Sequence, residues 1–82
     1  MTLTSFQQLP PLAQLYTALR LGLRLITQEL PGGTVKLYYL EGEPSFFAEL
    51  GVDAVSQRTT LLRSFALEEL PPEYVAYQTL PG

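Results

Sequence analysis

The spacing of the apolar residues changes at Gly22, and this change constrains the fold more than any other feature of the chain. Before Gly22 the apolar residues recur about every 3.6 residues, as in an amphipathic helix. After Gly22 they alternate as in β-strands, in runs separated by clusters of glycine, proline and polar residues. A helix followed by several strands with short turns is typical of an α+β domain.

The first pattern predicts a helix over 11–21, with Pro10-Pro11 at its start, where the missing N–H of proline costs nothing. We expect its apolar residues to face the core and its polar residues to face solvent. The expected inward-facing residues are Leu12, Leu15, Tyr16 and Leu19, and the expected outward-facing ones are Gln14, Thr17 and Arg20. Gly22 then stands where a left-handed C-terminal cap is expected.

The second pattern predicts four strands. They span 23–28, 34–41, 46–53 and 58–66. Short connections favour pairing between sequence neighbours, which gives an antiparallel meander. After Pro71-Pro72 we expect a short helix to about Gln78. Residues 1–82 are therefore predicted to form a single α+β domain with an N-terminal helix, a four-stranded antiparallel meander and a short C-terminal helix.

The predicted strands carry large apolar residues on both sides, whereas a half-buried sheet has one apolar and one polar face. One helix can cover only one face, so a second apolar face is expected. Its expected residues are Ile26, Tyr38, Leu40, Phe47, Leu61 and Phe65. Arg63 stands on the same predicted surface, and we expect it to pair with a carboxylate, Glu49 being the nearest across the hairpin.

Two arrangements would bury this second face. In the first, the C-terminal segment wraps across it and completes the core. In the second, the face is an interface, most simply in a two-fold homodimer. Only 16% of the residues are charged, below the usual quarter, so some apolar side chains must reach the surface. The sequence leaves both arrangements open.

The residues that carry most enzyme chemistry are absent. The chain has no histidine and no cysteine, which removes the usual general base, the thiolate nucleophile and a structural zinc site. The Gly32-Gly33 pair lacks the lysine of a phosphate-binding loop and is typical of a hairpin turn. The sequence therefore predicts no enzyme, no cofactor and no metal site, and it indicates no particular small-molecule ligand.

The charge balance bears on the class of partner. Five basic residues stand against eight acidic ones, for a net charge of −3, which disfavours binding to nucleic acid. No run approaches the length of about eighteen apolar residues that spans a membrane. Residues 1–9 contain no basic residue, whereas a signal peptide begins with a positively charged region. We therefore expect a cytoplasmic protein that binds neither nucleic acid nor membrane.

Two functions fit these observations. The first is a non-enzymatic protein-interaction module that forms a homodimer through the apolar sheet face. The alternative is a small acidic inhibitor or immunity-type protein that masks a basic site on an enzyme or toxin. The acids that would have to share one surface are Glu41, Glu43, Glu49, Asp53, Glu68 and Glu69.

Several strings resemble a group of short uncharacterised bacterial proteins of the Bacteroidetes type, with strands like LYxLxGFFVEV and RIxRLRSF. The matching residues are Leu37-Tyr38-Tyr39-Leu40, Phe46-Phe47-Ala48-Glu49, Arg58, Leu62-Arg63-Ser64-Phe65, Leu70 and Tyr74. The chain departs from that pattern by inserting Glu43-Pro44-Ser45 and by having Leu61 where a charged residue is expected. The resemblance implies the same order of elements and a bacterial origin, and it carries no assigned activity.

Overall fold

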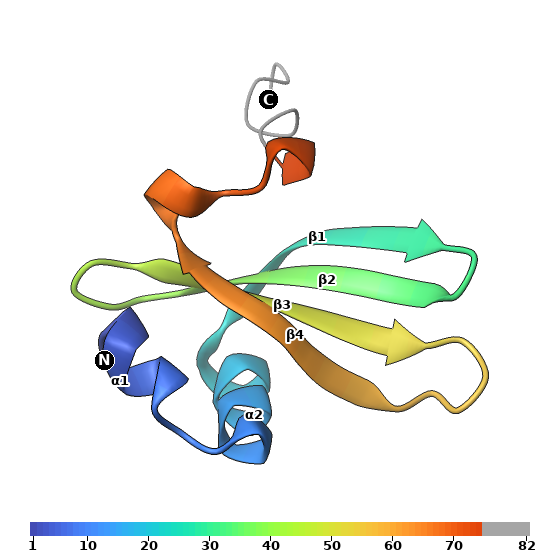
Figure 1. Ribbon diagram of the computed structural model, residues 1–82, viewed down its shortest axis with the longest axis horizontal. Helices are drawn as coiled ribbons and strands as arrows, with labels where there is room; N and C mark the ends of the chain where they lie inside the picture. The colour runs from blue at the N-terminus through green and yellow to red at the C-terminus, as the bar shows by residue number, and fades with distance from the viewer. Residues whose placement is uncertain (75–82) are drawn as a thin grey trace.

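The computed structural model describes residues 1–74, and its elements follow the predicted order (Figure 1). The helices are α1 (Leu3–Gln7) and α2 (Pro11–Leu21), and the strands are β1 (Leu23–Leu30), β2 (Gly33–Leu40), β3 (Phe46–Asp53) and β4 (Thr59–Ala66). A 3-10 helix, η1 (Leu67–Glu69), follows, and a helical turn forms at 72–74. The predicted α+β class is confirmed. The predicted continuation of the last helix to Gln78 lies outside the described residues.

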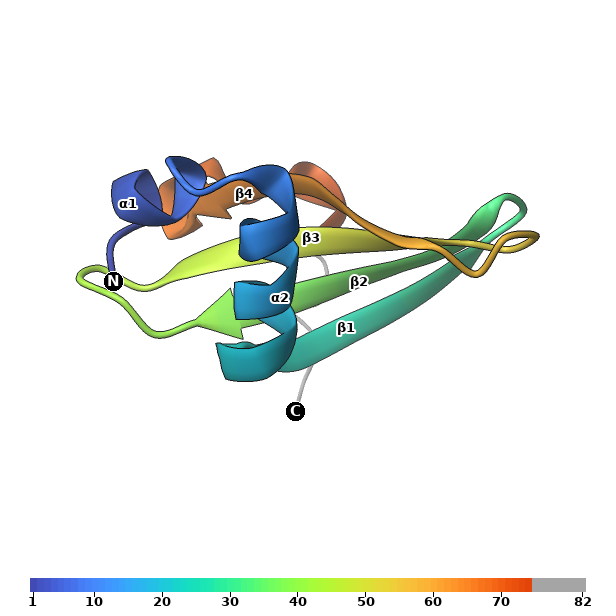
Figure 2. The same cartoon turned by 90° about the horizontal axis from the view of Figure 1, so that it is seen from below.

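The four strands form one antiparallel sheet in the order β1-β2-β3-β4, which confirms the meander. Seen from below, α2 crosses the strands on one face, and the two hairpin ends extend past it (Figure 2). We call the side that packs against α1 and α2 the helix face, and the opposite side the second face. Each face has its own cluster of buried residues.

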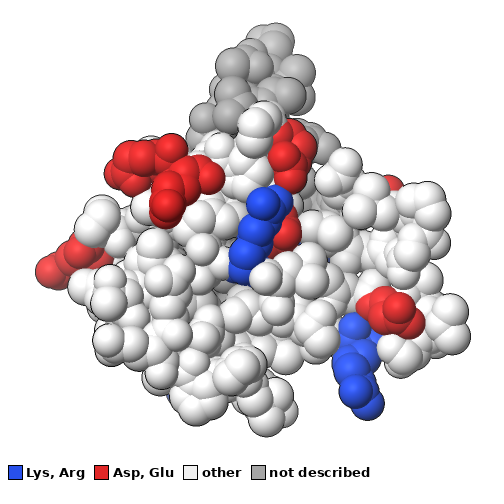
Figure 3. All heavy atoms as spheres, viewed as in Figure 1, with Lys and Arg blue, Asp and Glu red and all other residues white. Residues whose placement is uncertain are grey.

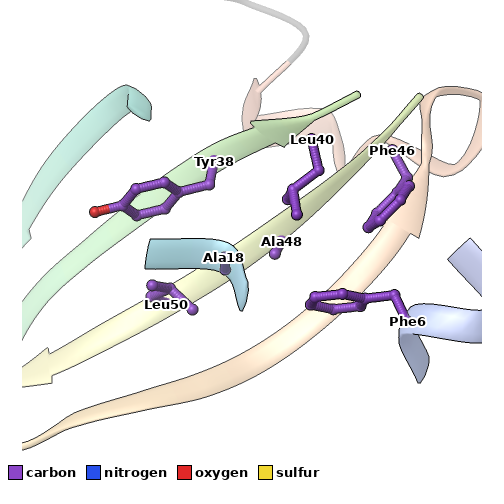
Figure 4. Close-up of a cluster of buried hydrophobic side chains, with 7 residues drawn as sticks. All are labelled: Phe6, Ala18, Tyr38, Leu40, Phe46, Ala48 and Leu50. Atoms are coloured by element: carbon purple, nitrogen blue, oxygen red, sulfur yellow. The ribbon is translucent and has the colours of Figure 1, made fainter. Parts of the chain in front are cut away.

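The cluster on the helix face is the larger one. Its seven buried residues are Phe6, Ala18, Tyr38, Leu40, Phe46, Ala48 and Leu50 (Figure 4). The rings of Phe6 and Phe46 meet with their centroids 5.2 Å apart, which joins α1 to the start of β3. Such tilted aromatic pairs contribute about 0.5–1.5 kcal/mol beyond the area they bury.

The cluster on the second face joins the sheet to the C-terminal segment. Leu37, Phe47 and Phe65 project from three adjacent strands, and Tyr74 packs on them. Phe65 stacks against Phe47 on one side and Tyr74 on the other, with centroid distances of 6.0 and 6.5 Å. Leu70 adds to this packing. The C-terminal segment thus covers part of the second face.

Helix α2 has the predicted ends but is rotated about its axis relative to the prediction: Leu15 packs against the helix-face cluster and Arg20 is exposed, as predicted, whereas the other predicted core residues are not buried. Leu12, Tyr16 and Leu19, expected in the core, are 61%, 63% and 47% exposed. The residues that α2 buries are Gln14 and Ala18. We call Leu12, Tyr16 and Leu19 the α2 stripe, because their spacing of four and three residues places them on one side of the helix.

Hydrogen bonding explains why a glutamine is buried. The side-chain amide of Gln14 donates to the carbonyl oxygens of Gln7 at 3.2 Å and Leu9 at 2.7 Å. These carbonyls lie at and just after the end of α1, where helical partners run out. A leucine at position 14 would leave both carbonyls without this donor.

Small residues explain the rest of the orientation. Ala18 lets the helix approach the sheet beside Tyr38. At Gly22 a Cβ atom would lie 2.5 Å from the Ala18 carbonyl oxygen and 3.2 Å from the Tyr38 side chain. Gly22 is therefore required by close packing. Its backbone is extended, with φ −81° and ψ 152°, so the predicted left-handed cap is wrong.

Two neighbouring substitutions in α2 test this orientation. Leu19→Ala is expected to change the free energy of unfolding by no more than about 0.5 kcal/mol. Ala18→Leu is expected to lower it by about 1–3 kcal/mol, because the added atoms have no space against the sheet. Urea denaturation at a fixed chain concentration measures both. A loss of about 2–5 kcal/mol for Leu19→Ala, as for a core leucine, would contradict the orientation.

Candidate interaction surface

Glu49 and Arg63 are directly opposite each other on β3 and β4, on the second face. The Arg63 Nε donates to Glu49 Oε1 at 2.9 Å, and one terminal nitrogen donates to Oε2 at 3.0 Å. The pair is therefore bidentate, the geometry in which arginine binds carboxylates most strongly. The guanidinium also lies 5.6 Å from the centre of the Phe65 ring. The predicted partner of Arg63 is confirmed.

The C-terminal segment completes this cluster. Glu73 accepts a third hydrogen bond from Arg63 at 2.9 Å, and the Tyr74 hydroxyl donates to Glu49 Oε2. The bond to Glu49 raises the pKa of Arg63. Burial, and then the bond to Glu49, raises the pKa of Tyr74. The backbone N–H of Glu73, and then Arg63, lowers the pKa of the Glu73 carboxyl.

The buried acid of this cluster, Glu49, is fully occupied by the other side chains. Both oxygens of Glu49 accept hydrogen bonds, so this buried acid is not available as a general base. Within residues 1–74 no buried side-chain nitrogen or oxygen lacks a partner, and no group of acids could hold a metal ion. The cluster fastens the C-terminal segment to the second face.

The seven predicted interface residues do not share one surface. Ile26, Phe47, Arg63 and Phe65 belong to the second face, where Phe47 and Phe65 are buried and Tyr74 packs on Phe65. The other three, Tyr38, Leu40 and Leu61, pack on the helix face.

Strand register explains the difference. Tyr38 pairs with Ala48, and Leu40 pairs with Phe46, so both point toward the helices. A bulge in the β3–β4 pairing turns Leu61 to the face opposite Arg63, although the two are only two positions apart. Tyr38 and Leu40 are therefore core residues.

Strand β1 is the most exposed part of the sheet. Leu23, Leu25 and Leu30 are 63%, 48% and 47% exposed. In the described part of the chain β1 pairs only with β2, so its outer edge has no strand beside it. The other edge strand, β4, contacts α1, where the Gln7 amide donates to Ser64 Oγ at 3.1 Å. Sequence reasoning could have marked β1 as a candidate from its position as the first strand of a meander.

A shallow hollow continues this apolar surface on the sheet near the hairpin ends. It has a volume of about 520 Å³, and its lining includes Leu30, Val35, Gly51 and Leu62. Gly51 leaves room in the middle of the sheet, and Leu62 lies over it, 3.1 Å from where a Cβ would stand. An unpaired edge strand beside an apolar hollow is a surface that protein partners use.

The six acids that the inhibitor alternative invokes come from three parts of the structure, namely β3, the β2–β3 connection and η1. Glu49 is bound to Arg63, and Asp53 accepts bonds from the backbone N–H groups of Val55 and Ser56. The bonds from Ser56, and then Val55, lower the pKa of Asp53. The remaining four, Glu41, Glu43, Glu68 and Glu69, lie in the β2–β3 connection or in η1. Figure 3 shows acidic groups on the upper left of this face and a wide uncharged area below them.

Comparison of the chain with known proteins finds no match. No family model matches the chain, and neither a curated protein nor a solved structure matches it. Among residues 1–74 no helix is both long and apolar enough to cross a membrane.

Proposed function

We propose that this chain is a non-enzymatic protein-interaction module that self-associates through the uncovered part of its sheet. The observation that carries the proposal is the open edge of β1, with Leu23, Leu25 and Leu30 about half exposed or more. Each such side chain, when fully buried by a partner, contributes about 1.5–3 kcal/mol. A second copy is the simplest partner, since two-fold dimers are the commonest oligomers.

The hydrogen bonds among Glu49, Arg63, Glu73 and Tyr74 support a role in binding over a role in catalysis. Glu49, Arg63 and Tyr74 are the best-placed reactive side chains of the second face, and they bind one another. A catalytic acid or base needs a free position toward a substrate. By contrast, the outer edge of β1 has no strand beside it among the described residues.

Light scattering coupled to size-exclusion chromatography tests the proposal. At tens of micromolar we expect a mass of twice 9.1 kDa, falling toward 9.1 kDa on dilution. Leu19→Ser is the control, because Leu19 is as exposed as Leu30 but lies in the α2 stripe. That variant should dimerise like the wild type. A wild-type chain that stays monomeric up to hundreds of micromolar would refute the proposal.

A further inference from the structure

The structure points to one particular geometry for this association. We propose that β1 pairs antiparallel with β1 of a second copy across a two-fold axis, so that Arg24 of each copy lies opposite Glu29 of the other. This inference rests on the proposed self-association and specifies its register. The open edge of β1 supplies the backbone groups, and the distribution of side chains along β1 selects the alignment.

The pairing of β1 with β2 shows which way each β1 residue faces. Arg24, Thr27 and Glu29 pair with Tyr38, Lys36 and Thr34, which places them on the helix face. Leu23, Ile26, Gln28 and Leu30 pair with Tyr39, Leu37, Val35 and Gly33, which places them on the second face. Arg24 and Ile26 face opposite sides although they are two positions apart, because the strand has a bulge between them.

If the two-fold axis passes through Thr27, the residues that lie opposite each other on the two β1 strands belong to the same face. Ile26 then lies opposite Gln28 of the second copy, both on the second face. At the bulge, β1 has one extra residue between Arg24 and Ile26. The partner strand leaves this extra residue unpaired, because residues that lie directly opposite each other share a face. Arg24 then lies opposite Glu29, and Leu23 lies opposite Leu30. The symmetry produces each of these pairs twice.

Charge selects this register over its neighbours. Arg24 and Glu29 are both exposed, and neither forms an ion pair within residues 1–74. Moving the second strand by two residues in either direction separates both Arg24–Glu29 pairs. The same shift separates Leu23 from Leu30. Apolar contact and opposite charge therefore favour the same alignment.

Strand β1 also lacks the features that keep edge strands apart. Its eight residues include no proline and no lysine, and its two charges have opposite signs. The axis is perpendicular to the sheet, so pairing would join two sheets into one and keep α1 and α2 of both copies on the same side.

Charge reversal tests the register. Arg24→Glu and Glu29→Arg each place like charges at both symmetric pairs, and each is expected to raise the dimer Kd at least about tenfold. The double variant restores opposite charges and is expected to return the Kd to within about threefold of wild type. Sedimentation equilibrium in 50 mM and 500 mM salt measures all three, and the deficit of the single variants should shrink in high salt.

Arg20→Glu is the matched control for Arg24→Glu, because it makes the same charge change at an exposed position of α2. It should leave the Kd within about threefold of wild type. If the wild type is a monomer, the proposed function itself fails. If the wild type dimerises but Arg24→Glu behaves like Arg20→Glu, or the double variant stays as weak as the single ones, self-association stands and the β1 pairing is overturned.

Discussion

Replacing Phe46 by alanine is expected to lower the free energy of unfolding by about 3–5 kcal/mol. Phe46 is 0% exposed, and its ring packs on Phe6 at 5.2 Å. The substitution removes one of the contacts that join α1 to the sheet and leaves a cavity at the start of β3. A domain of this length has a total stability of about 4–12 kcal/mol, so the variant should be largely unfolded at moderate urea concentrations. Urea denaturation followed by circular dichroism measures the change.

A conservative variant keeps this prediction testable if the alanine variant does not fold. Phe46→Leu retains much of the apolar volume and should lose only about 1–2 kcal/mol. Val55→Ala is the control, because Val55 is 93% exposed in the β3–β4 turn, and its loss should stay below about 0.5 kcal/mol. If Phe46→Ala loses no more free energy of unfolding than Val55→Ala, Phe46 is not part of the core on the helix face.

The elements of this fold could be predicted because their signals are local. The helix at 11–21 and the four strands are bounded by prolines, glycines and changes of period that are visible in the sequence. The orientation of α2 could not be predicted in the same way. The pattern of Leu12, Tyr16 and Leu19 indicates a core-facing stripe. A buried Gln14 becomes favourable only because its amide donates to carbonyls at and just after the end of α1.

The two sides of the sheet illustrate a similar limit. The pairing of Arg63 with Glu49 could be predicted, because a charge among apolar strand residues requires an opposite charge nearby. The faces of Tyr38 and Leu40 depend on the register with β3, and the face of Leu61 depends on a bulge. A register shift of one residue turns a side chain to the other face, and no local pattern marks the bulge here.

The cover of the second face depends on a contact between distant parts of the chain. Tyr74 lies 25 residues from its partner Glu49, and no periodicity links the two positions. The sequence therefore left the wrapped C-terminal segment and the dimer interface as alternatives. The structure places Tyr74 on Phe65, which moves the exposed apolar surface from the middle of the second face to β1.

Replacing Tyr74 by alanine is expected to lower the free energy of unfolding by about 3–5 kcal/mol. The ring is buried against Phe65, and the hydroxyl donates to Glu49. Its loss would also expose Phe65 to solvent. Tyr74→Phe keeps the ring and removes only the hydroxyl, with an expected loss of about 1.5–3 kcal/mol. If Tyr74→Ala costs no more than Val55→Ala, the C-terminal segment does not hold the second face.

Alkaline titration separates the hydroxyl from the ring. Burial, and then the bond to Glu49, raises the pKa of Tyr74 above its unfolded value of about 10. Above that pH the folded chain keeps a proton that the unfolded chain loses, so stability falls as pH rises, by at most about 1.4 kcal/mol per pH unit from this group. Below pH 10 its contribution is fully present. The stability difference between wild type and Tyr74→Phe should therefore narrow by up to about 2 kcal/mol between about pH 10 and 11.5. A constant difference across that range would show that Tyr74 ionises alike in both states.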